Sequence, residues 1–120
     1  MAFQNFATWN IEGYADDKQI MIEHYMQTMA IGLMCIQETH RTINDCFITD
    51  AGYLTILSGK FGGNYAGVGF IIAPWLRHAI YRFDCHSDRL AALKISITGG
   101  KIAFVNAYAP QNEIALDIRK

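Results

Sequence analysis

The sequence predicts an α+β fold in which one mixed β-sheet is covered by a single helix. Short apolar or alternating runs recur along the chain, as expected for strands. Only one segment, beginning at Asp16, has a clear apolar stripe at helical spacing. Polar or glycine-containing turns separate the strand-like runs. With 120 residues, the chain is one domain at most.

The first two elements are a strand and a helix. Alternating residues predict a strand over Asn5–Ile11. Asp16 and Asp17 then provide helix-start chemistry, and Gln19 follows Asp16 in a capping-box-like arrangement. A helix of roughly four turns is expected here. Its apolar stripe consists of Ile22, Tyr25, Met26 and Met29.

The next segment is a continuous apolar run at Ile31–Gln37, which is typical of a strand covered on both faces. Because a helix connects it to the first strand, the two strands are expected to be parallel or to share a sheet interior. The polar stretch 38–47 is interpreted as a loop, and a short strand is expected around Tyr53–Leu57.

The second half of the chain contains four more strand-like runs after the turn-forming stretch 59–67. The pair Gly99–Gly100 predicts a hairpin between the last two of them. The final stretch, 111–120, resembles the opening of a second helix. The four runs are 68–73, 77–83, 89–97 and 101–109.

A single helix covers only one face of such a sheet, so the other face is expected to be exposed and apolar. Soluble monomers rarely expose contiguous apolar areas beyond a few hundred Å². The sequence therefore predicts aggregation, molten behaviour or self-association of the isolated chain. The residues assigned to this exposed face are Val68, Phe70, Ile72, Leu93, Ile95 and Phe104.

Charge and cysteine usage restrict the functional classes. The net charge of −1 provides no overall attraction to polyanions, so any polyanion must bind at a local site. Three scattered cysteines, Cys35, Cys46 and Cys85, suit reduced thiols in an intracellular protein, nuclear or cytoplasmic. No apolar run is long enough to span a bilayer, and a secretory signal is not expected.

Polar residues follow the first two predicted strands where each strand ends. Asn10 ends the first strand, and Glu38 directly follows the second. If these strands are neighbours, the two side chains meet at one sheet edge. One carboxylate and one amide suit Mg²⁺, which retains several waters. A purely structural interpretation is also open, in which Asn10 caps a turn and Glu38 is solvated.

A third polar group follows the last strand-like run, in the stretch "NAYAP" from Asn106 to Pro110. The hydroxyl of Tyr108 could hydrogen-bond a phosphate oxygen or a metal-bound water. Taken alone, an amphipathic tyrosine at a strand end is the more common situation.

Together these segments resemble a known family. "TWNIEG", "CIQETH", "GVGFII", "DRLAALKI" and "NAYAPQ", in this order, resemble the first half of the endonuclease/exonuclease/phosphatase family, which has a deoxyribonuclease I-like fold. The stretches "CIQETH" and "NAYAP" are most similar to the apurinic-type endonucleases of non-LTR retrotransposons. The resemblance covers essentially the whole chain and implies half of a four-layer α/β sandwich.

The resemblance implies roles for five residues. The glutamate that matches Glu38 is the metal carboxylate, and the asparagine that matches Asn10 helps to hold the metal and the scissile phosphate. The tyrosine that matches Tyr108 reaches the phosphate region. Arg89 is expected at the site rim, where it contacts phosphate or braces strands, and His40 is expected to contact substrate. The implied cofactor is Mg²⁺, for which Mn²⁺ can substitute.

The family pattern also contains motifs that this sequence lacks. A Gly-Asp-x-Asn motif, whose aspartate activates the attacking water, and a closing Asp-His pair do not occur among the 120 residues. We therefore interpret residues 1–120 as the N-terminal part of such a domain, incomplete and inactive as a fragment. The missing C-terminal half is one expected partner, and self-association through the exposed sheet is another.

Two hypotheses from different classes follow. The first is a Mg²⁺-dependent phosphodiester hydrolase, a DNA endonuclease of retrotransposon type, of which this chain carries half the site. The second is a non-catalytic truncated remnant that acts, if at all, by pairing its exposed sheet with a partner. The residues leave RNA, a phospholipid head group and an inositol phosphate open as alternative substrates to DNA.

Overall fold

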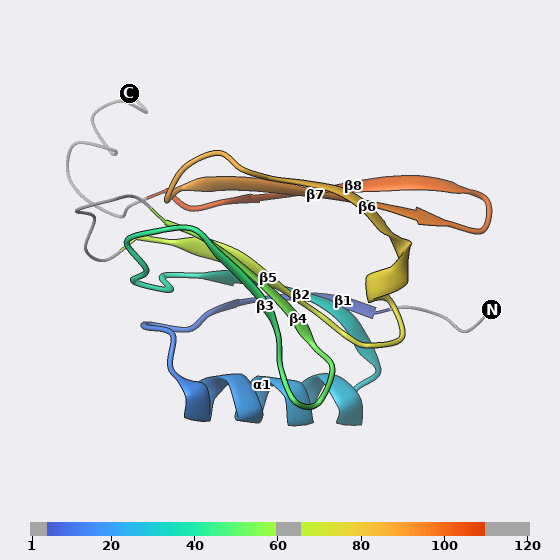
Figure 1. Cartoon of the computed structure of the whole chain (residues 1–120), viewed down its shortest axis with the longest axis horizontal. Coiled ribbons are helices and arrows are strands. Elements are labelled where there is room, and N and C mark those ends of the chain that lie inside the picture. The colour runs from blue at the N-terminus through green and yellow to red at the C-terminus, as the bar shows by residue number, and fades with distance from the viewer. Residues whose placement is uncertain (1–4, 60–65, 110–120) are drawn as a thin grey trace.

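The computed structural model describes residues 5–59 and 66–109 and contains three layers (Figure 1). Helix α1 (Asp16–Thr28) forms the first layer, a five-stranded sheet the second and a three-stranded sheet the third. The predicted α+β class, with a helix on a mixed sheet, is confirmed. Within these residues, no helix is both long and apolar enough to cross a membrane.

The five-stranded sheet has the order β1-β2-β5-β4-β3. Strands β1 and β2 are parallel, as the helical crossover between them predicts, and all other neighbours are antiparallel. Both β2 and β5 lie inside the sheet, which explains their continuous apolar sequences. The strands are Asn5–Asn10 (β1), Ile31–Gln37 (β2), Asp45–Ile48 (β3), Leu54–Ser58 (β4) and Val68–Ile72 (β5).

The remaining strands form a separate antiparallel sheet of β6 (Ile80–Cys85), β7 (Leu90–Ile97) and β8 (Gly100–Ala107). The predicted glycine hairpin joins β7 to β8, where Ile97 pairs with Gly100. The expectation of a single sheet is therefore wrong. Pro74 follows β5 and cannot donate a ladder hydrogen bond, and a 3₁₀ turn, η1 (Arg77–Ala79), leads the chain across to the second layer.

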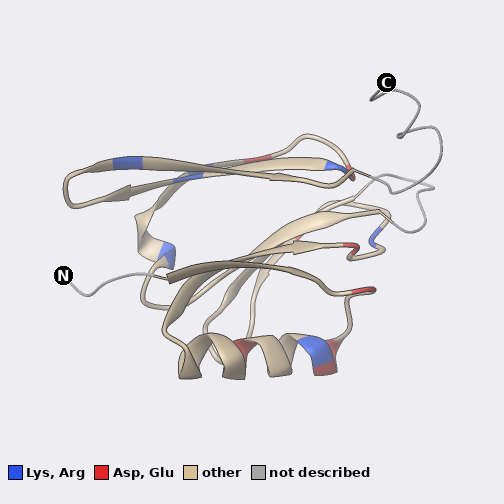
Figure 2. Cartoon of the chain, turned by 180° about the vertical axis from the view of Figure 1, so that it is seen from behind, with Lys and Arg blue, Asp and Glu red and all other residues tan. Residues whose placement is uncertain are grey.

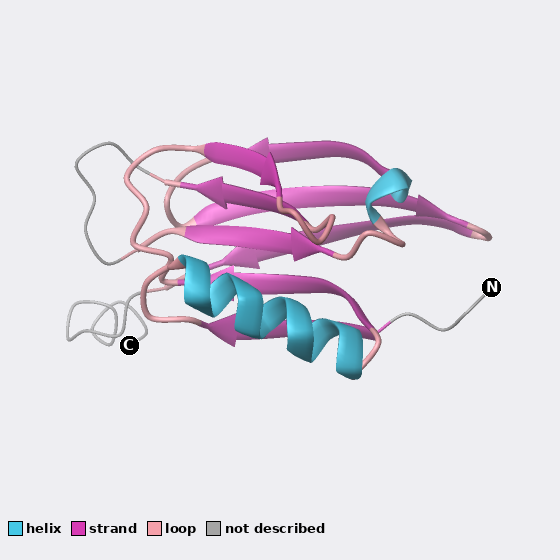
Figure 3. Cartoon of the chain, turned by 60° about the horizontal axis from the view of Figure 1, so that its bottom comes forward, coloured by secondary structure: helices cyan, strands magenta, loops and turns pink. Residues whose placement is uncertain are grey.

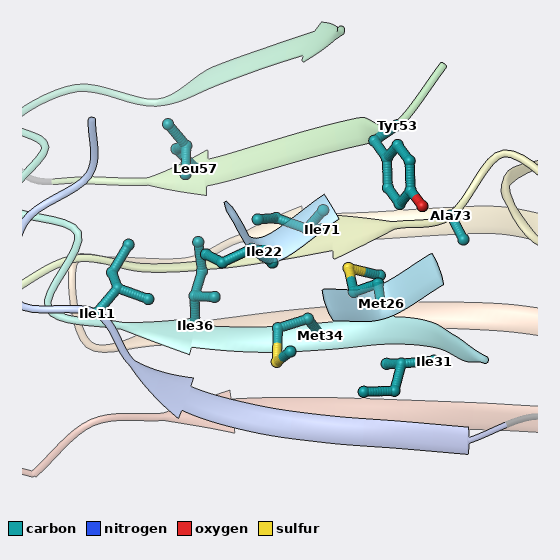
Figure 4. Close-up of a cluster of buried hydrophobic side chains, with 10 residues drawn as sticks. All are labelled: Ile11, Ile22, Met26, Ile31, Met34, Ile36, Tyr53, Leu57, Ile71 and Ala73. Atoms are coloured by element: carbon teal, nitrogen blue, oxygen red, sulfur yellow. The ribbon is translucent and has the colours of Figure 1, made fainter. Parts of the chain in front are cut away.

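The helix packs on one face of the five-stranded sheet (Figure 3). Ile22 and Met26 of α1 are fully buried in this core, whose side chains are shown in Figure 4. The predicted stripe is only partly correct, because Tyr25 and Met29 are about half exposed. The capping-box expectation is also wrong. No side chain caps the helix, and Gln19 is instead buried, where its Nε2 donates to Glu23 Oε2 at 2.8 Å.

The second face of the five-stranded sheet is covered by the three-stranded sheet. Phe70 of β5 and Leu93 of β7 are fully buried in the core between the sheets. The predicted exposed patch is therefore wrong, because the second sheet covers the first (Figure 1). Of the six residues assigned to it, Val68, Phe70, Ile72, Leu93 and Ile95 are buried, and Phe104 is partly buried against them.

One short segment that was expected to be a loop is a strand in the structure. Residues Asp45–Ile48 form strand β3, although the stretch 38–47 was expected to be a loop. This strand is short and largely exposed, so its pairing with β4 stabilises it more than its own apolar content does. The predicted opening of a second helix, 111–120, lies outside the described residues.

The C-terminal end of α1 offers a stabilising substitution. Ala30 follows the helix in the left-handed conformation, with φ 54°, and is exposed. Glycine is favoured there because a Cβ costs about 1–2 kcal/mol in that conformation. We expect Ala30→Gly to raise the free energy of unfolding by about 1 kcal/mol in chemical denaturation. Ala7→Gly, in β1 with no positive φ, should destabilise the protein.

Candidate functional site

Strands β1, β2 and β8 all end on the same side of the sandwich, at the left of Figure 1. Asn10 is the last residue of β1, Glu38 follows β2 directly, and Tyr108 follows β8. Asn10 Nδ2 donates to Glu38 Oε2 at 2.9 Å, and Tyr108 Oη donates to the same oxygen at 3.0 Å. The three predicted site residues are therefore in direct contact.

The sheets that supply the site residues differ from the prediction. Asn10, Glu38 and Tyr108 were expected at the edge of a single sheet, but Tyr108 comes from the second sheet. The site thus spans the two layers. Part of the structural interpretation of Asn10 also holds, because its Oδ1 accepts a hydrogen bond from the Glu12 backbone N–H at 3.2 Å. One side chain both closes a turn and holds the carboxylate.

The backbone around Glu38 is held from two sides. On one side, the N–H of Gly13 donates to the Glu38 carbonyl oxygen at 2.6 Å. On the other side, the N–H of Thr39 donates to Gly67 O at 3.1 Å. Glu38 itself has a left-handed backbone, with φ 56°, which is costly for a residue with a Cβ. Such a conformation persists only where the surroundings fix it, as these hydrogen bonds do.

The other two predicted residues lie around this cluster. The guanidinium carbon of Arg89 is 6.0 Å from the centre of the Tyr108 ring, and Arg89 O accepts the Tyr108 backbone N–H at 2.9 Å. Arg89 therefore lies next to Tyr108, at the margin of the cluster. His40 lies in the loop after β2, with φ 62°, and is partly buried. After the hydrogen bonds from Asn10 and Tyr108, the electrostatic influence of His40 also lowers the pKa of Glu38.

The hydrogen bonds set the protonation behaviour of the cluster. Those from Asn10 and, second, from Tyr108 hold the pKa of Glu38 below its ordinary value. Burial, followed by the hydrogen bond to Glu38, raises the pKa of Tyr108. Glu38 is therefore a carboxylate and Tyr108 a neutral hydrogen-bond donor at neutral pH.

A pH titration tests this arrangement. We expect Asn10→Ala to raise the pKa of Glu38 toward its ordinary value, and Tyr108→Phe to raise it by less. Because the pKa is lowered on folding, the carboxylate contributes stability above its unfolded pKa, and this contribution is lost as pH falls through its folded pKa. Carboxyl NMR shifts followed against pH measure the change. Equal Glu38 pKa values in both variants and the original chain would contradict it.

A groove of about 430 Å³ lies beside the cluster, between the edges of the two sheets. Its polar lining includes residues that the sequence analysis did not single out, namely Thr8, Gln37 and Asn106. Gln37 Nε2 donates to both Thr8 Oγ1 and Asn106 Oδ1, each at 2.9 Å. Asn106 stands within the quoted "NAYAP" stretch, but its burial depends on the second sheet, which local sequence does not reveal.

The described residues contain no group of three or more His, Cys, Asp or Glu side chains arranged to hold a metal ion. Among the three residues in contact, Glu38 carries the carboxylate. Among the described residues, lysines and arginines lie on the helix, the 3₁₀ turn, the three-stranded sheet and the loops, and none lies on a strand of the five-stranded sheet (Figure 2). Neither the models of known protein families nor the curated proteins include a match to this sequence.

Proposed function

We propose that this site is part of a Mg²⁺-dependent phosphodiester hydrolase of the endonuclease/exonuclease/phosphatase type, a DNA endonuclease similar to those of non-LTR retrotransposons. The contact of Asn10, Glu38 and Tyr108 carries the proposal. The resemblance implied that these residues act together, although they lie far apart in the sequence. The meeting of Asn10 and Glu38 also follows from the pairing of β1 with β2, so the added contact of Tyr108, from the second sheet, is the stronger support.

The chemistry of the cluster fits a hard cation. Both hydrogen bonds to the Glu38 carboxylate end on Oε2, and among the described residues none reaches Oε1. That oxygen can serve as a ligand without the loss of either contact. Mg²⁺ takes one or two carboxylates and keeps several waters, so a single carboxylate is a sufficient protein contribution. When bound, the ion would neutralise charge on the phosphate oxygens.

The residues around Glu38 supply hydrogen-bond donors to a phosphodiester. Tyr108 is a neutral donor, and its hydroxyl can turn from Glu38 to a phosphate oxygen. The Arg89 side chain and His40 lie at the margins of the cluster, where substrate contact is expected. Phosphodiester hydrolysis also needs a group that orients the attacking water. None of the residues assigned to the site has that role.

We assign that role to a partner segment, the C-terminal half that the family resemblance implies. Strands β1 and β8 are the edge strands nearest the site, and the groove between them is lined by Thr8 and Val105. Unpaired strand edges are templates for pairing with another segment. The same edges favour the second hypothesis, a non-catalytic remnant that pairs with a partner or with its own copy.

We also propose an intracellular location, nuclear or cytoplasmic. Cys35, Cys46 and Cys85 are all free thiols in the structure. Burial raises the pKa of Cys35 to about 11, which keeps that thiol protonated and poorly reactive. Free cysteines of this kind suit a reducing compartment.

Metal binding tests the proposed site directly. We expect Mn²⁺, used as a paramagnetic substitute for Mg²⁺, to broaden NMR signals around Glu38. Glu38→Gln should weaken binding by about 10-fold or more because it removes the carboxylate ligand. Glu12→Gln is the matched control, since Glu12 lies in the neighbouring loop, also with a left-handed backbone. Equal Mn²⁺ affinity in the two variants would contradict the proposal.

A nicking assay separates the two hypotheses. With residues 1–120 alone, we expect no nicking of supercoiled plasmid above a Glu38→Ala control in Mg²⁺. Loss of one transition-state donor costs on the order of 10²–10³ in rate, and a group that acts as a unit does not retain partial activity. Metal-dependent nicking that Glu38→Ala abolishes would show that the chain, or a second copy of it, completes the site.

A further inference from the structure

Asn106 is a polar residue in an otherwise apolar row. The side chains of β8 alternate, and Ile102, Phe104 and Asn106 point toward the other sheet. Asn106 is only 3% exposed, and it lies where Ile102 and Phe104 predict another apolar residue. A buried amide is unfavourable unless its hydrogen bonds are made, so its position requires an explanation.

The structure shows where those hydrogen bonds are made. Asn106 Nδ2 donates to Ile36 O of β2 at 3.0 Å and to Gly69 O of β5 at 2.8 Å. Its Oδ1 accepts from Gln37 Nε2 at 2.9 Å. The amide orientation is unambiguous, because both backbone partners are carbonyl oxygens and can only accept. One side chain of the smaller sheet thus joins two adjacent strands of the larger sheet.

This link lies directly next to both halves of the candidate site. Gln37, which donates to Asn106, immediately precedes Glu38. Tyr108 is two residues beyond Asn106, where strand geometry places a side chain on the same face. Glu38 belongs to the larger sheet and Tyr108 to the smaller one. Their contact therefore depends on how the two sheets are aligned at this end, and Asn106 fixes that alignment.

We propose that Asn106 is a positioning residue, which holds β8 against β2 and β5 so that the Tyr108 hydroxyl reaches the Glu38 carboxylate. The proposal that Asn106 aligns the two sheets depends on the hydrogen bonds alone. The expected effect on metal and phosphate binding rests on the proposed function. An amide that only stabilised the packing would lower stability when removed, but it would leave the contact between Tyr108 and Glu38 in place.

The test compares Asn106→Leu with Ile102→Ala. Leucine has the same branched side-chain skeleton as asparagine but makes no hydrogen bond. Ile102→Ala removes packing from the same face of β8, farther from the site. We expect the nuclear Overhauser effect between the Tyr108 ring and the Glu38 side chain to disappear in Asn106→Leu and to remain in Ile102→Ala. Its persistence in Asn106→Leu, with only a lower melting temperature, would overturn the proposal.

If Asn106→Leu does not fold, a milder substitution tests whether Asn106 positions Tyr108 against Glu38. Gln37 is partly exposed, and Gln37→Met removes its hydrogen bond to Asn106 Oδ1 while leaving the buried amide in place. A weaker Overhauser effect between Tyr108 and Glu38 supports the proposal, and an unchanged one overturns it. This measurement uses the full chain without metal, so it does not depend on the proposed function.

Metal affinity then tests the functional consequence. Loss of a residue that orients a metal ligand typically weakens metal binding by 10-fold or more. We expect Asn106→Leu to weaken Mn²⁺ binding by about 10-fold, and Ile102→Ala to leave it unchanged. If the original chain binds no Mn²⁺, the proposed function fails, while the Overhauser effect still decides the role of Asn106.

Discussion

Replacement of Phe70 by alanine should lower the free energy of unfolding by about 3–5 kcal/mol. Phe70 lies on β5, the strand between β2 and β4, and is fully buried between the two sheets. Its removal leaves a cavity that the paired backbone of an interior strand cannot close. Because domains of this size have only about 5–15 kcal/mol of stability, the loss should be evident in urea unfolding at 25 °C.

Phe83→Ala is the matched control for this prediction. Phe83 lies on β6, an edge strand of the smaller sheet, and is 45% exposed. The same chemical change there should cost much less, because much of that ring is already in water. If the two variants lose the same stability, the two sheets do not pack in solution as the structure describes.

The local pattern of the sequence predicts most of the elements but not their assembly. Strand β2 could be predicted from its continuous apolar run, and helix α1 from the helical spacing of apolar residues such as Ile22 and Met26. Strand β3 could not, since its stability comes from pairing with β4. The separation of the strands into two sheets could not be predicted either. It depends on the crossing at Pro74 and on contacts between residues far apart in the chain.

The candidate site shows the same division. The grouping of Asn10, Glu38 and Tyr108 could be predicted because each ends or follows a strand-like run within a segment that resembles the family pattern. The buried residues that support them could not be predicted. Asn106 is buried against a second sheet that local sequence does not reveal, and Thr39 is buried in a loop that packs against Gly67. Polar residues at strand ends can be recognised in the local sequence, whereas the buried residues that support them depend on tertiary contacts.

Gly67→Ala should have the second large effect, and it acts on the loop that carries Glu38. Gly67 has φ 108°, a conformation that L side chains rarely adopt. A Cβ at this position would also overlap Thr39 Oγ1, and Thr39 is only 1% exposed. Backbone strain and overpacking each cost about 1–3 kcal/mol, so we expect a loss of about 2–6 kcal/mol in urea unfolding.

Gly99→Ala separates these two causes. Gly99 also has a positive φ, 96°, but a Cβ there meets no atom within 4 Å. That substitution should therefore cost only the backbone strain, about 1–2 kcal/mol. Equal losses at the two glycines would show that the contact between Gly67 and Thr39 is unimportant.

A double substitution shows whether the overlap disturbs the site. Thr39→Ala removes the oxygen that the added methyl group would meet, so Gly67→Ala should lower the free energy of unfolding less in that background than in the original chain.

Thr39 directly follows Glu38, and its N–H donates to Gly67 O at 3.1 Å. Gly67→Ala should therefore also weaken Mn²⁺ binding at Glu38, whereas Gly99→Ala, in the β7–β8 hairpin turn, should leave it unchanged. If the two glycine variants bind Mn²⁺ equally well, the Gly67 contact does not hold the carboxylate in place.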